Sequence, residues 1–457
     1  MNAETGTEFA SMDMIATEWE KKAETRELII GVIGLGYVGL PLAQAYCRQG
    51  FRVVGFDVSP EKVKLLGDGK SFIKHISDES VKVMRDTGRF EATTDFDRLN
   101  EPDALLICVP TPLNAHRDPD LAYVESATRE ISTRLRKGQM VVLESTTYPG
   151  TSDEVMKPIL EQESGLKAGV DFAIAYSPER EDPGNPKFET STIPKVVGAD
   201  TDAEKRMAIA VYQAIVPQVV PVSDVRTAEA VKLTENIYRA VNIALVNELK
   251  SVYSVMGIDV WEVINAAATK PFGFQAFYPG PGLGGHCIPI DPFYLSWKAR
   301  EYGLTTRFIE LSGEINANMP GIVVQTVAEE LSARLQKSIK GANILLVGLA
   351  YKKNVDDMRE SPSLTLIEML EARGAKVDYY DPYIPVVPYD RDHAEFEGRK
   401  SVDWTPEALA KYDAALIATD HDNVDYDLLL KNIPFAVDTR NATHMISGQL
   451  REKIVKA

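Results

Sequence analysis

A glycine-rich turn near the start of the chain, set between an apolar strand and a helix, most constrains how this sequence can fold. Gly34, Gly36 and Gly39 are spaced G-x-G-x-x-G directly after the run LIIGVI. The first glycine permits a tight turn, the second admits a pyrophosphate to the backbone, and the third lets the helix pack on the strand. The next strand ends at Asp57, whose carboxylate would accept ribose hydroxyls and repel a 2′-phosphate. This context predicts NAD binding in preference to NADP; the alternative is a plain tight turn with Asp57 as a solvated strand end.

Apolar strands alternate with helical or loop stretches on both sides of a long helical segment. Further strand-like runs lie at residues 104–110, 140–146, 172–178 and 195–199. After Asp224, about thirty residues read as one helix, apolar around most of its girth, which must be buried or shared with a partner. Near Lys340 the pattern restarts, with Gly348 in the turn and Asp381 at the second strand's end. We expect an α/β fold in which two Rossmann-like doubly wound parallel-sheet domains are joined by a central long-helix domain.

These transitions give the expected domain boundaries. Residues 1–27 should form a polar N-terminal tail or a short loose helix, because they lack the apolar core of a secretory signal. The remaining segments are an NAD-binding Rossmann domain at 28–222, a central helical domain with a cysteine-bearing loop at 223–320, and a second Rossmann-like domain at 321–457.

Composition excludes two classes of partner. The 457 residues carry a formal net charge of -17, which argues against binding to nucleic acid, and no apolar run is long enough to span a membrane. The three cysteines have no metal-ligand spacing, so we expect no metal site and a reducing, cytoplasmic location.

Cys287 is the candidate nucleophile among those cysteines. It lies in GLGGHC, within a Gly- and Pro-rich loop, and Asp291 follows four residues later. Flanking glycines let a substrate approach closely, and a loop thiol can be exposed. A structural role for Cys287 remains the alternative, and the neighbouring His286 is better read as structural. Cys108 and Cys47 lie on an apolar strand and on the helix after the glycine turn, so we expect both to be buried and inert.

Lys232 and Asn236 are one turn apart on the long helix and share a face. Such a pair of donors suits a developing alkoxide or oxyanion, although Lys232 could instead simply extend to water. Glu179 and Arg180 directly follow a strand, where active-site groups of α/β proteins gather, but charged loop residues are usually just solvated.

Taken together, these motifs resemble the UDP-glucose and GDP-mannose dehydrogenase superfamily, from Leu28 onward. The matching segments are GLGYVGLP, VPTP at 109–112, STTYPG at 145–150, SPE at 177–179, KLTEN at 232–236, GLGGHCIPID at 282–291, GLAYKKNVDDMRESPS at 348–363 and DTRN at 438–441.

The resemblance implies an oxidoreductase that converts the sugar C6 alcohol of a nucleotide sugar to a carboxylate, with NAD as hydride acceptor. It makes Cys287 the covalent nucleophile, Lys232 and Asn236 the oxyanion pair, and Asp291 with Thr146 the holders of a catalytic water. It adds Glu179 as a further active-site carboxylate. The implied cofactor contacts are Gly34, Gly36, Tyr37, Val38, Gly39, Asp57, Pro110, Thr111 and Arg359. The implied contacts of a UDP-sugar, held largely by the last domain, are Glu179, Arg180, Lys232, Asn236, Tyr278, Gly284, Lys352 and Arg440.

Two positions differ from the UDP-glucose branch of that family. Pro183 stands where that branch often has a second glutamate, and Tyr278 where it often has a lysine. The segments around them are similar to bacterial UDP-N-acetylglucosamine 6-dehydrogenases, which act in polysaccharide synthesis. UDP-N-acetylglucosamine is therefore the expected substrate; the alternatives are UDP-glucose, UDP-N-acetylmannosamine, GDP-mannose, or a non-catalytic nucleotide-sugar sensor. The resemblance also implies a homodimer, or a higher homo-oligomer, built on the long helix.

Overall fold

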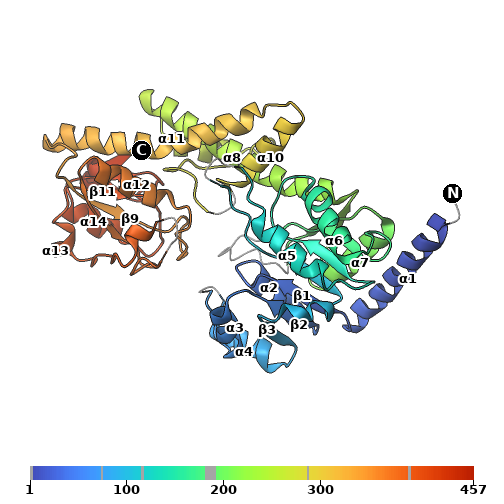
Figure 1. The fold of residues 1–457 in the computed structure, drawn as a ribbon. Coiled ribbons are helices and arrows are strands. Elements are labelled where there is room, and N and C mark those ends of the chain that lie inside the picture. The colour runs from blue at the N-terminus through green and yellow to red at the C-terminus, as the bar shows by residue number, and fades with distance from the viewer. Residues whose placement is uncertain (1–3, 74–75, 115–117, 181–191, 286–287, 390–392) are drawn as a thin grey trace. The chain divides into compact units, whose positions relative to one another are not determined.

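The computed structural model describes residues 4–457, with the exception of 74–75, 115–117, 181–191, 286–287 and 390–392 (Figure 1). The chain forms two compact units. The first comprises Met1–Glu235 and Trp297–Leu304, and the second Asn236–Ser296 and Thr305–Ala457. Each unit contains one sheet, so the two α/β domains expected from the sequence are confirmed.

The first unit is built on an eight-stranded sheet of order β3-β2-β1-β4-β5-β6-β7-β8. All neighbouring strands are parallel except β6 and β7, which pair antiparallel. The strands are β1 (Ile29–Ile33), β2 (Arg52–Phe56), β3 (Phe90–Thr93), β4 (Ala104–Ile107), β5 (Met140–Leu143), β6 (Ala173–Tyr176), β7 (Lys195–Gly198) and β8 (Val219–Val222). Strands β3 and β8 lie at the two edges of the sheet, and the sequence analysis did not predict them.

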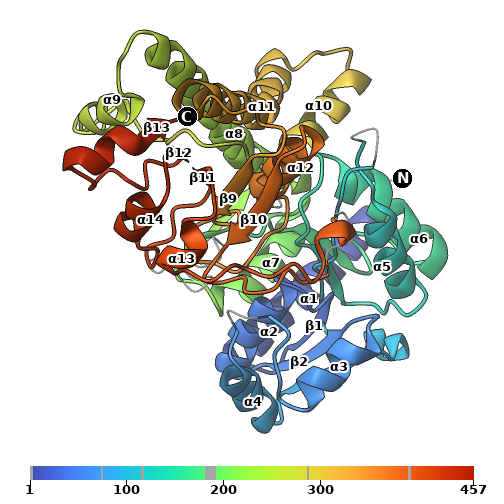
Figure 2. The same cartoon turned by 90° about the vertical axis from the view of Figure 1, so that its left-hand side faces the viewer.

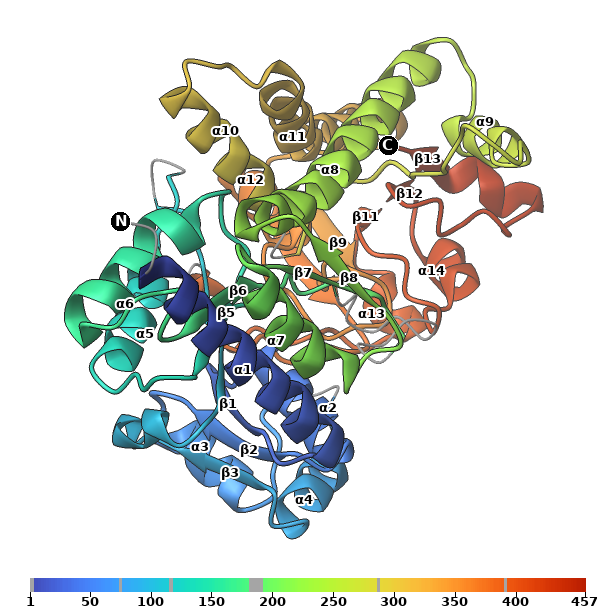
Figure 3. The same cartoon turned by 90° about the vertical axis from the view of Figure 1, so that its right-hand side faces the viewer.

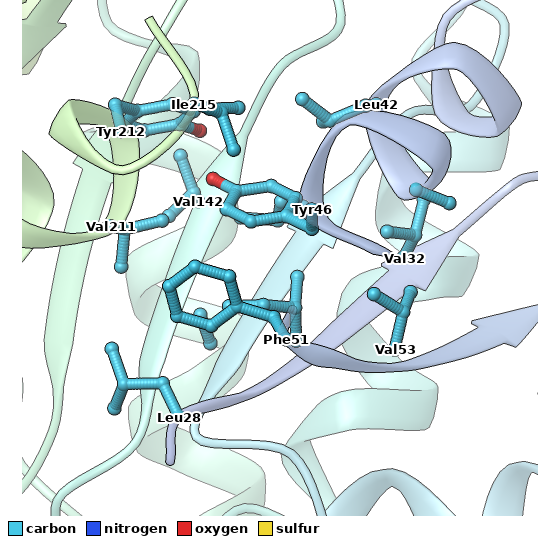
Figure 4. Close-up of a cluster of buried hydrophobic side chains, with 14 of the residues drawn as sticks. Leu28, Val32, Leu42, Tyr46, Phe51, Val53, Val142, Val211, Tyr212 and Ile215 are labelled. Carbon is cyan, nitrogen blue, oxygen red and sulfur yellow. The ribbon is translucent and has the colours of Figure 1, made fainter. Parts of the chain in front are cut away.

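Helices cover both faces of this sheet, as a doubly wound fold requires. Along β4, Ala104 and Leu106 join one hydrophobic cluster and Leu105 and Ile107 the other, because successive side chains of a strand point to opposite faces. Figure 4 shows the first cluster, in which Tyr46 and Tyr212 lie above the strand residues. The helices are α1 (Glu4–Thr25), α2 (Gly39–Arg48), α3 (Pro60–Gly67), α4 (Asp78–Asp86), α5 (Ala122–Ser132), α6 (Lys157–Ser164) and α7 (Asp202–Gln213).

The N-terminal segment corrects one expectation. It is neither a polar tail nor a loose helix, because α1 packs along α7 (Figure 3). Met12, Ala16, Trp19 and Ala23 recur at helical spacing and are buried in the first unit's core. The indole nitrogen of Trp19 donates to the carbonyl of Gly138 at 3.1 Å. From Asp13 onward the charged residues of α1 are exposed or half-buried, which is why the segment reads as polar when its composition alone is considered.

The second unit holds a parallel sheet of order β10-β9-β11-β12-β13 (Figure 2). Its strands are β9 (Asn343–Val347), β10 (Lys376–Tyr380), β11 (Ala414–Ile417), β12 (Ala436–Asp438) and β13 (Ile454–Lys456), and its helices include α12 (Pro362–Ala372), α13 (Pro406–Leu409) and α14 (Tyr426–Asn432). Along β9, Ile344 and Leu346 face one cluster while Leu345 and Val347 face the other. This sheet too is covered on both faces, as predicted.

Two long helices accompany these sheets. The predicted long helix is α8 (Val225–Val255), and α9 (Val260–Ala267) follows it as expected. After α10 (Asp291–Glu301), α11 runs over Arg307–Leu335 with Pro320 inside it. The expected boundary between residues 320 and 321 therefore falls within a continuous helix. Val323, Val327 and Leu331 of α11 belong to the core of the second sheet, so this helix serves both segments.

Candidate active site

The glycine turn of the first unit has the geometry that a dinucleotide requires. Gly34 has φ +90, and a Cβ there would lie 2.6 Å from the carbonyl oxygen of Cys108. At Gly39 a Cβ would lie only 1.9 Å from the carbonyl oxygen of Gly34, whereas at Gly36 it would meet nothing within 4 Å. The first and third glycines are thus needed for the turn and for helix packing. The space at Gly36 fits a pyrophosphate beside the N-terminus of α2.

Asp57 lies at the carboxyl end of β2, as predicted. Its Oδ2 accepts from the backbone N–H of Leu35 and its Oδ1 from that of Ser59, both at 3.0 Å. Lys62 places its Nζ 3.5 Å from the same carboxylate. Asp57 is therefore oriented by the glycine turn itself, rather than being a solvated strand end.

Other expected cofactor contacts are distributed over both units. In the first, Thr111 is buried and Pro110 exposed after β4, while Tyr37 is exposed and Val38 half-buried in the glycine turn. In the second unit, Arg359 is half-buried and its guanidinium binds both carboxylate oxygens of Asp357.

Lys232 is buried on α8 in the first unit, with 8% of its surface exposed. Its Nζ donates to the backbone carbonyl oxygen of Glu179, which follows β6. The reading in which this lysine extends to water is therefore wrong. Arg180 donates to the carboxylate of Glu235 at 2.6 Å. Thr146 follows β5 and is half-buried.

Asn236 and Asp291 meet in the second unit. The Nδ2 of Asn236 donates to Oδ2 of Asp291 at 2.5 Å, and both side chains are almost fully buried. Asp291 is the first residue of α10, where a carboxylate also interacts favourably with the helix dipole. A buried carboxylate held by an amide can orient a water or a hydroxyl proton.

The Gly- and Pro-rich segment packs closely on the second unit's α/β layer. A Cβ at Gly280 would lie 2.4 Å from Nη1 of Arg440, and one at Gly284 would lie 2.8 Å from Cβ of Tyr351. Tyr351 adjoins Lys352, which is half-buried. The structure thus places Gly280 beside Arg440, and Gly284 beside the neighbour of Lys352.

Comparison with known proteins identifies the chain's relatives. The models of the UDP-glucose/GDP-mannose dehydrogenase family match consecutive segments: the NAD binding domain at residues 28–216, the central domain at 226–318 and the UDP binding domain at 345–445. The chain belongs to the UDP-glucose/GDP-mannose dehydrogenase family. It is therefore an NAD-dependent oxidoreductase, and the first unit carries its NAD-binding domain.

Curated relatives of this dehydrogenase cover most of its length. It is 36% identical to the UDP-N-acetyl-D-glucosamine 6-dehydrogenase of Pseudomonas aeruginosa, over 79% of this chain and 84% of that one. It is 35% identical to the UDP-N-acetyl-D-mannosamine dehydrogenase of Pyrococcus horikoshii, over 86% and 89% of the two chains. A solved structure of UDP-D-ManNAc dehydrogenase from Pyrococcus horikoshii superposes with a TM-score of 0.82 at 33% identity, covering 91% of this chain and 96% of that chain.

Several expectations for this dehydrogenase concern cysteines. Cys287, His286 and Pro183 lie outside the described residues, so the nucleophile remains a prediction. Cys47 and Cys108 are buried, as expected. Burial raises the pKa of the Cys47 thiol to about 12, and that of Cys108 well above its usual range, which makes both poor nucleophiles.

Sequence reasoning missed two buried lysines in this dehydrogenase. Lys195 begins β7 and binds Glu144, which follows β5. Lys250, on α8, has no hydrogen-bond partner for its Nζ among the described residues. Burial and the nearby charge of Arg440 lower the pKa of Lys250 to about 7, against the opposing effect of Asp438. The signal available for Lys195 was a lysine directly before the apolar run VVGA, and Lys250 lies among polar residues of the long helix with no comparable signal.

Membrane and metal features were also predicted to be absent. No helix within the described ranges is long and apolar enough to cross a membrane. Glu368, His393 and Glu395 bring potential ligand atoms within 4.8 Å of one another at the surface. Exposed groups of this kind are common without an ion, so the expectation of no metal stays a prediction.

Proposed function

We propose that this dehydrogenase oxidises C6 of a UDP-N-acetylhexosamine, with UDP-N-acetylglucosamine as its best substrate, to the uronic acid in two NAD-dependent steps. The buried hydrogen bond between Asn236 and Asp291 is the observation that carries the proposal. A carboxylate and an amide are buried there against each other, their hydrogen bond offsets the cost of that burial, and both come from segments that match the family's central domain. The curated relatives that act on N-acetylated UDP-sugars support the substrate class.

In this mechanism α8 supplies the groups that stabilise negative oxygen. Lys232 and Asn236 are one turn apart on the helix and donate to the alkoxide that forms as the C6 hydroxyl loses its proton. Asp291 holds the water that takes this proton, with Thr146 as its second holder and Lys232 in support. Each donor of this kind is worth a few kcal/mol of transition-state stabilisation.

NAD, when bound, accepts one hydride from C6 in each oxidation step. Cys287 adds to the aldehyde carbon after the first step and gives a thiohemiacetal, whose carbon again bears a hydrogen and an oxygen. Loss of the second hydride leaves a thioester, and water cleaves it to the carboxylate and the free thiol. Two NADH therefore form for each acid.

The nucleotide halves have separate binding regions in this proposal. Gly36, Asp57 and Thr111 contact NAD in the first unit. Arg440 and Lys352 contact the UDP group in the second, where the match to the family's UDP binding domain supports a UDP-sugar. Arg359 contributes a further contact to NAD. We expect the reaction to take place in the cytoplasm, on the nucleotide sugars present there.

The choice of sugar depends on Tyr278. Its side chain is half-exposed, and its hydroxyl donates to Oδ1 of Asn265 at 2.9 Å. We propose that the ring of Tyr278 contacts the acetamido methyl of the sugar. Its hydroxyl would then donate to the acetamido carbonyl oxygen instead of to Asn265. The Pyrococcus horikoshii relative makes UDP-N-acetylmannosamine the second candidate.

A homodimer through α8 is part of the proposal. Tyr238, Leu245 and Val252 are spaced by seven residues, so they lie along one side of the helix, and each exposes about half of its side chain. An apolar stripe of this kind on a stable helix is typical of a contact with a second chain.

The test is a panel of UDP-N-acetylglucosamine, UDP-N-acetylmannosamine, UDP-glucose and GDP-mannose, followed by NADH absorbance. We expect turnover with the two N-acetylated sugars and the highest efficiency with UDP-N-acetylglucosamine. If no NADH formed with any of the four sugars, the proposed dehydrogenase activity would be contradicted. The alternative of a non-catalytic nucleotide-sugar sensor would then be favoured.

A further inference from the structure

The antiparallel strand of the first sheet carries a lysine to the edge where active-site groups gather. Because β7 runs against β6, with Tyr176 opposite Gly198, its first residue lies beside the residues that follow the parallel strands. That first residue is Lys195. Had β7 been parallel to β6, Lys195 would lie beside the amino end of β6 and not beside its carboxyl end. Its position therefore follows from strand direction, which the sequence pattern does not reveal.

Lys195 is bound by two carboxylates from neighbouring strand ends. Its Nζ donates to Oε2 of Glu144 at 2.6 Å and lies 3.6 Å from Oε2 of Glu179. The other oxygen of Glu144 accepts from the hydroxyl of Tyr212, whose ring lies 5.3 Å from the ammonium. Lys195 and Glu144 are both almost fully buried.

A buried ion pair is not needed to stabilise this core. An apolar pair of similar volume is often equally stable or more stable, because taking two charges out of water is costly. Glu144 and Tyr212 alone would need no cation if the carboxyl were protonated. The added feature is Glu179, a half-buried carboxylate that faces the same ammonium.

Glu179 links this cluster to the proposed catalytic lysine. Its backbone carbonyl oxygen accepts from Nζ of Lys232, and its own Oε1 accepts from the backbone N–H of Arg180 at 2.7 Å. The guanidinium of Arg180 is held by Glu235. A shift of the Glu179 side chain would therefore disturb the segment that orients Lys232.

The charges of the cluster agree with this arrangement. Burial alone would lower the pKa of Lys195, but the charges of Glu144 and Glu179 raise it above its ordinary value. The other titratable groups near Lys195 are Tyr212 and Cys108, and burial raises the pKa of both well above their usual range. Lys195 is thus the cation that these two carboxylates share.

We propose that Lys195 is a positioning residue of the active site, whose ammonium joins the buried Glu144 to Glu179 and fixes the carboxylate of Glu179 in its orientation and charge. The proposal rests on the proposed function for the role of Glu179. Lys195 acts through Glu179 and not on the substrate.

The test compares pH profiles of Lys195→Met/Glu144→Gln with the wild-type enzyme. Burial raises the pKa of Glu144, so Lys195→Met alone would leave a carboxyl that takes up a proton in the core. The double variant avoids this, because the amide introduced by Glu144→Gln does not take up a proton. Its oxygen can still accept a hydrogen bond from the Tyr212 hydroxyl. The positive charge of Lys195 is then lost from beside Glu179, so we expect the acid limb of the kcat profile to move to higher pH by about one unit or more. We expect kcat to fall roughly ten- to a hundredfold.

Tyr46→Phe is the matched control, because the Tyr46 hydroxyl is buried in the same core and has no hydrogen-bond partner among the described residues (Figure 4). It should keep the wild-type profile. If Lys195 only neutralised Glu144, the double variant would also keep the wild-type pH profile, and this result would overturn the proposal.

A second measurement does not depend on turnover. In protein labelled with 13C-carboxyl glutamate, the Glu179 resonance is assigned by its loss in Glu179→Gln. Its titration midpoint should rise in the double variant, and an unchanged midpoint would overturn the proposal. A wild-type protein that oxidises none of the four sugars would refute the proposed function, while this midpoint would still decide whether Lys195 fixes Glu179.

Discussion

At the scale of single residues, we propose that Asp57 sets the choice between NAD and NADP. We expect Asp57→Ala to narrow the ratio of kcat/KM for NAD over NADP by roughly ten- to a hundredfold, the effect of about 1.4 to 2.7 kcal/mol. The carboxylate would no longer repel a 2′-phosphate, and Lys62, now 3.5 Å from it, could bind that phosphate instead. Steady-state kinetics with both cofactors measures the ratio.

Asp57→Asn is the control for that experiment, because it removes the charge and keeps an oxygen that can accept from Leu35 or Ser59. It should narrow the ratio as well. A wild-type enzyme that used NADP as efficiently as NAD would show that Asp57 does not select the cofactor.

Cys287 is the second residue whose role can be isolated. Cys287→Ala should abolish formation of the acid, because no thiohemiacetal can form, while NAD and UDP still bind. Product analysis measures the acid, and calorimetric titration measures the binding. Cys47→Ala should remain active, since that thiol is buried with a pKa of about 12. An alanine variant at 287 that still made acid would exclude the covalent mechanism.

The sequence predicted residues whose chemistry is local. The turn at Gly34 and Gly39, with Asp57 after β2, could be identified because their spacing within one βαβ unit determines their contacts. The pair Lys195–Glu144 could not, since 51 residues separate its members and their contact depends on the direction of β7. Likewise, Asn236 was predicted as a donor, but its bond to Asp291 requires the start of α10 to meet α8.

At the scale of secondary-structure elements, α1 is a structural part of the NAD-binding unit. Trp19→Ala should destabilise that unit by about 3 kcal/mol, because it removes a buried indole and its bond to Gly138. Thermal unfolding should show a Tm lower by several degrees. Met14→Ala, at an exposed position of the same helix, should change stability by less than about 0.5 kcal/mol. Equal Tm values for the two variants would mean that α1 adds little to the core.

The apolar stripe on α8 gives a second prediction for an element. Leu245→Glu should convert a dimer to a monomer in light scattering, because a carboxylate would have to be desolvated in the interface. Ser254→Glu, nine residues and about two and a half turns further along, projects from the other side of the helix and should leave the dimer intact. A dimer that persisted in Leu245→Glu would place the interface elsewhere.

The expectations for elements succeeded where periodicity was strong. The helix after Asp224 and most strands of both sheets followed from apolar runs, and α8 matches its predicted length. Strands β3, β8 and β13 lie at the edges of their sheets and are mostly half-buried or exposed, so no continuous apolar run marks them. The N-terminal helix was misjudged because Met12, Ala16, Trp19 and Ala23 are thinly spread among charged residues, and only packing on α7 makes them a face.

At the scale of the whole molecule, the two α/β layers each place an aspartate after their second strand, and the contacts of these two aspartates differ. Asp381 occupies in the second unit the place that Asp57 has in the first, and its Oδ2 accepts from the N–H of Leu349 at 2.7 Å. There the side chain of His421 also contacts Asp381, at 3.0 Å. The Asp381 carboxylate of the second unit is therefore already bound by a neighbouring side chain, and this unit carries the match to the family's UDP binding domain.

The central claim, a dehydrogenase for UDP-N-acetylglucosamine, is tested most directly by the ratio of kcat/KM for UDP-N-acetylglucosamine and UDP-glucose with NAD. A pocket that satisfies the acetamido group leaves polar groups unpaired with UDP-glucose, a penalty of about 1–3 kcal/mol. We predict a ratio of roughly ten to a hundred in favour of UDP-N-acetylglucosamine, with two NADH formed per acid. A ratio that favours UDP-glucose, or one NADH per product, would contradict the account.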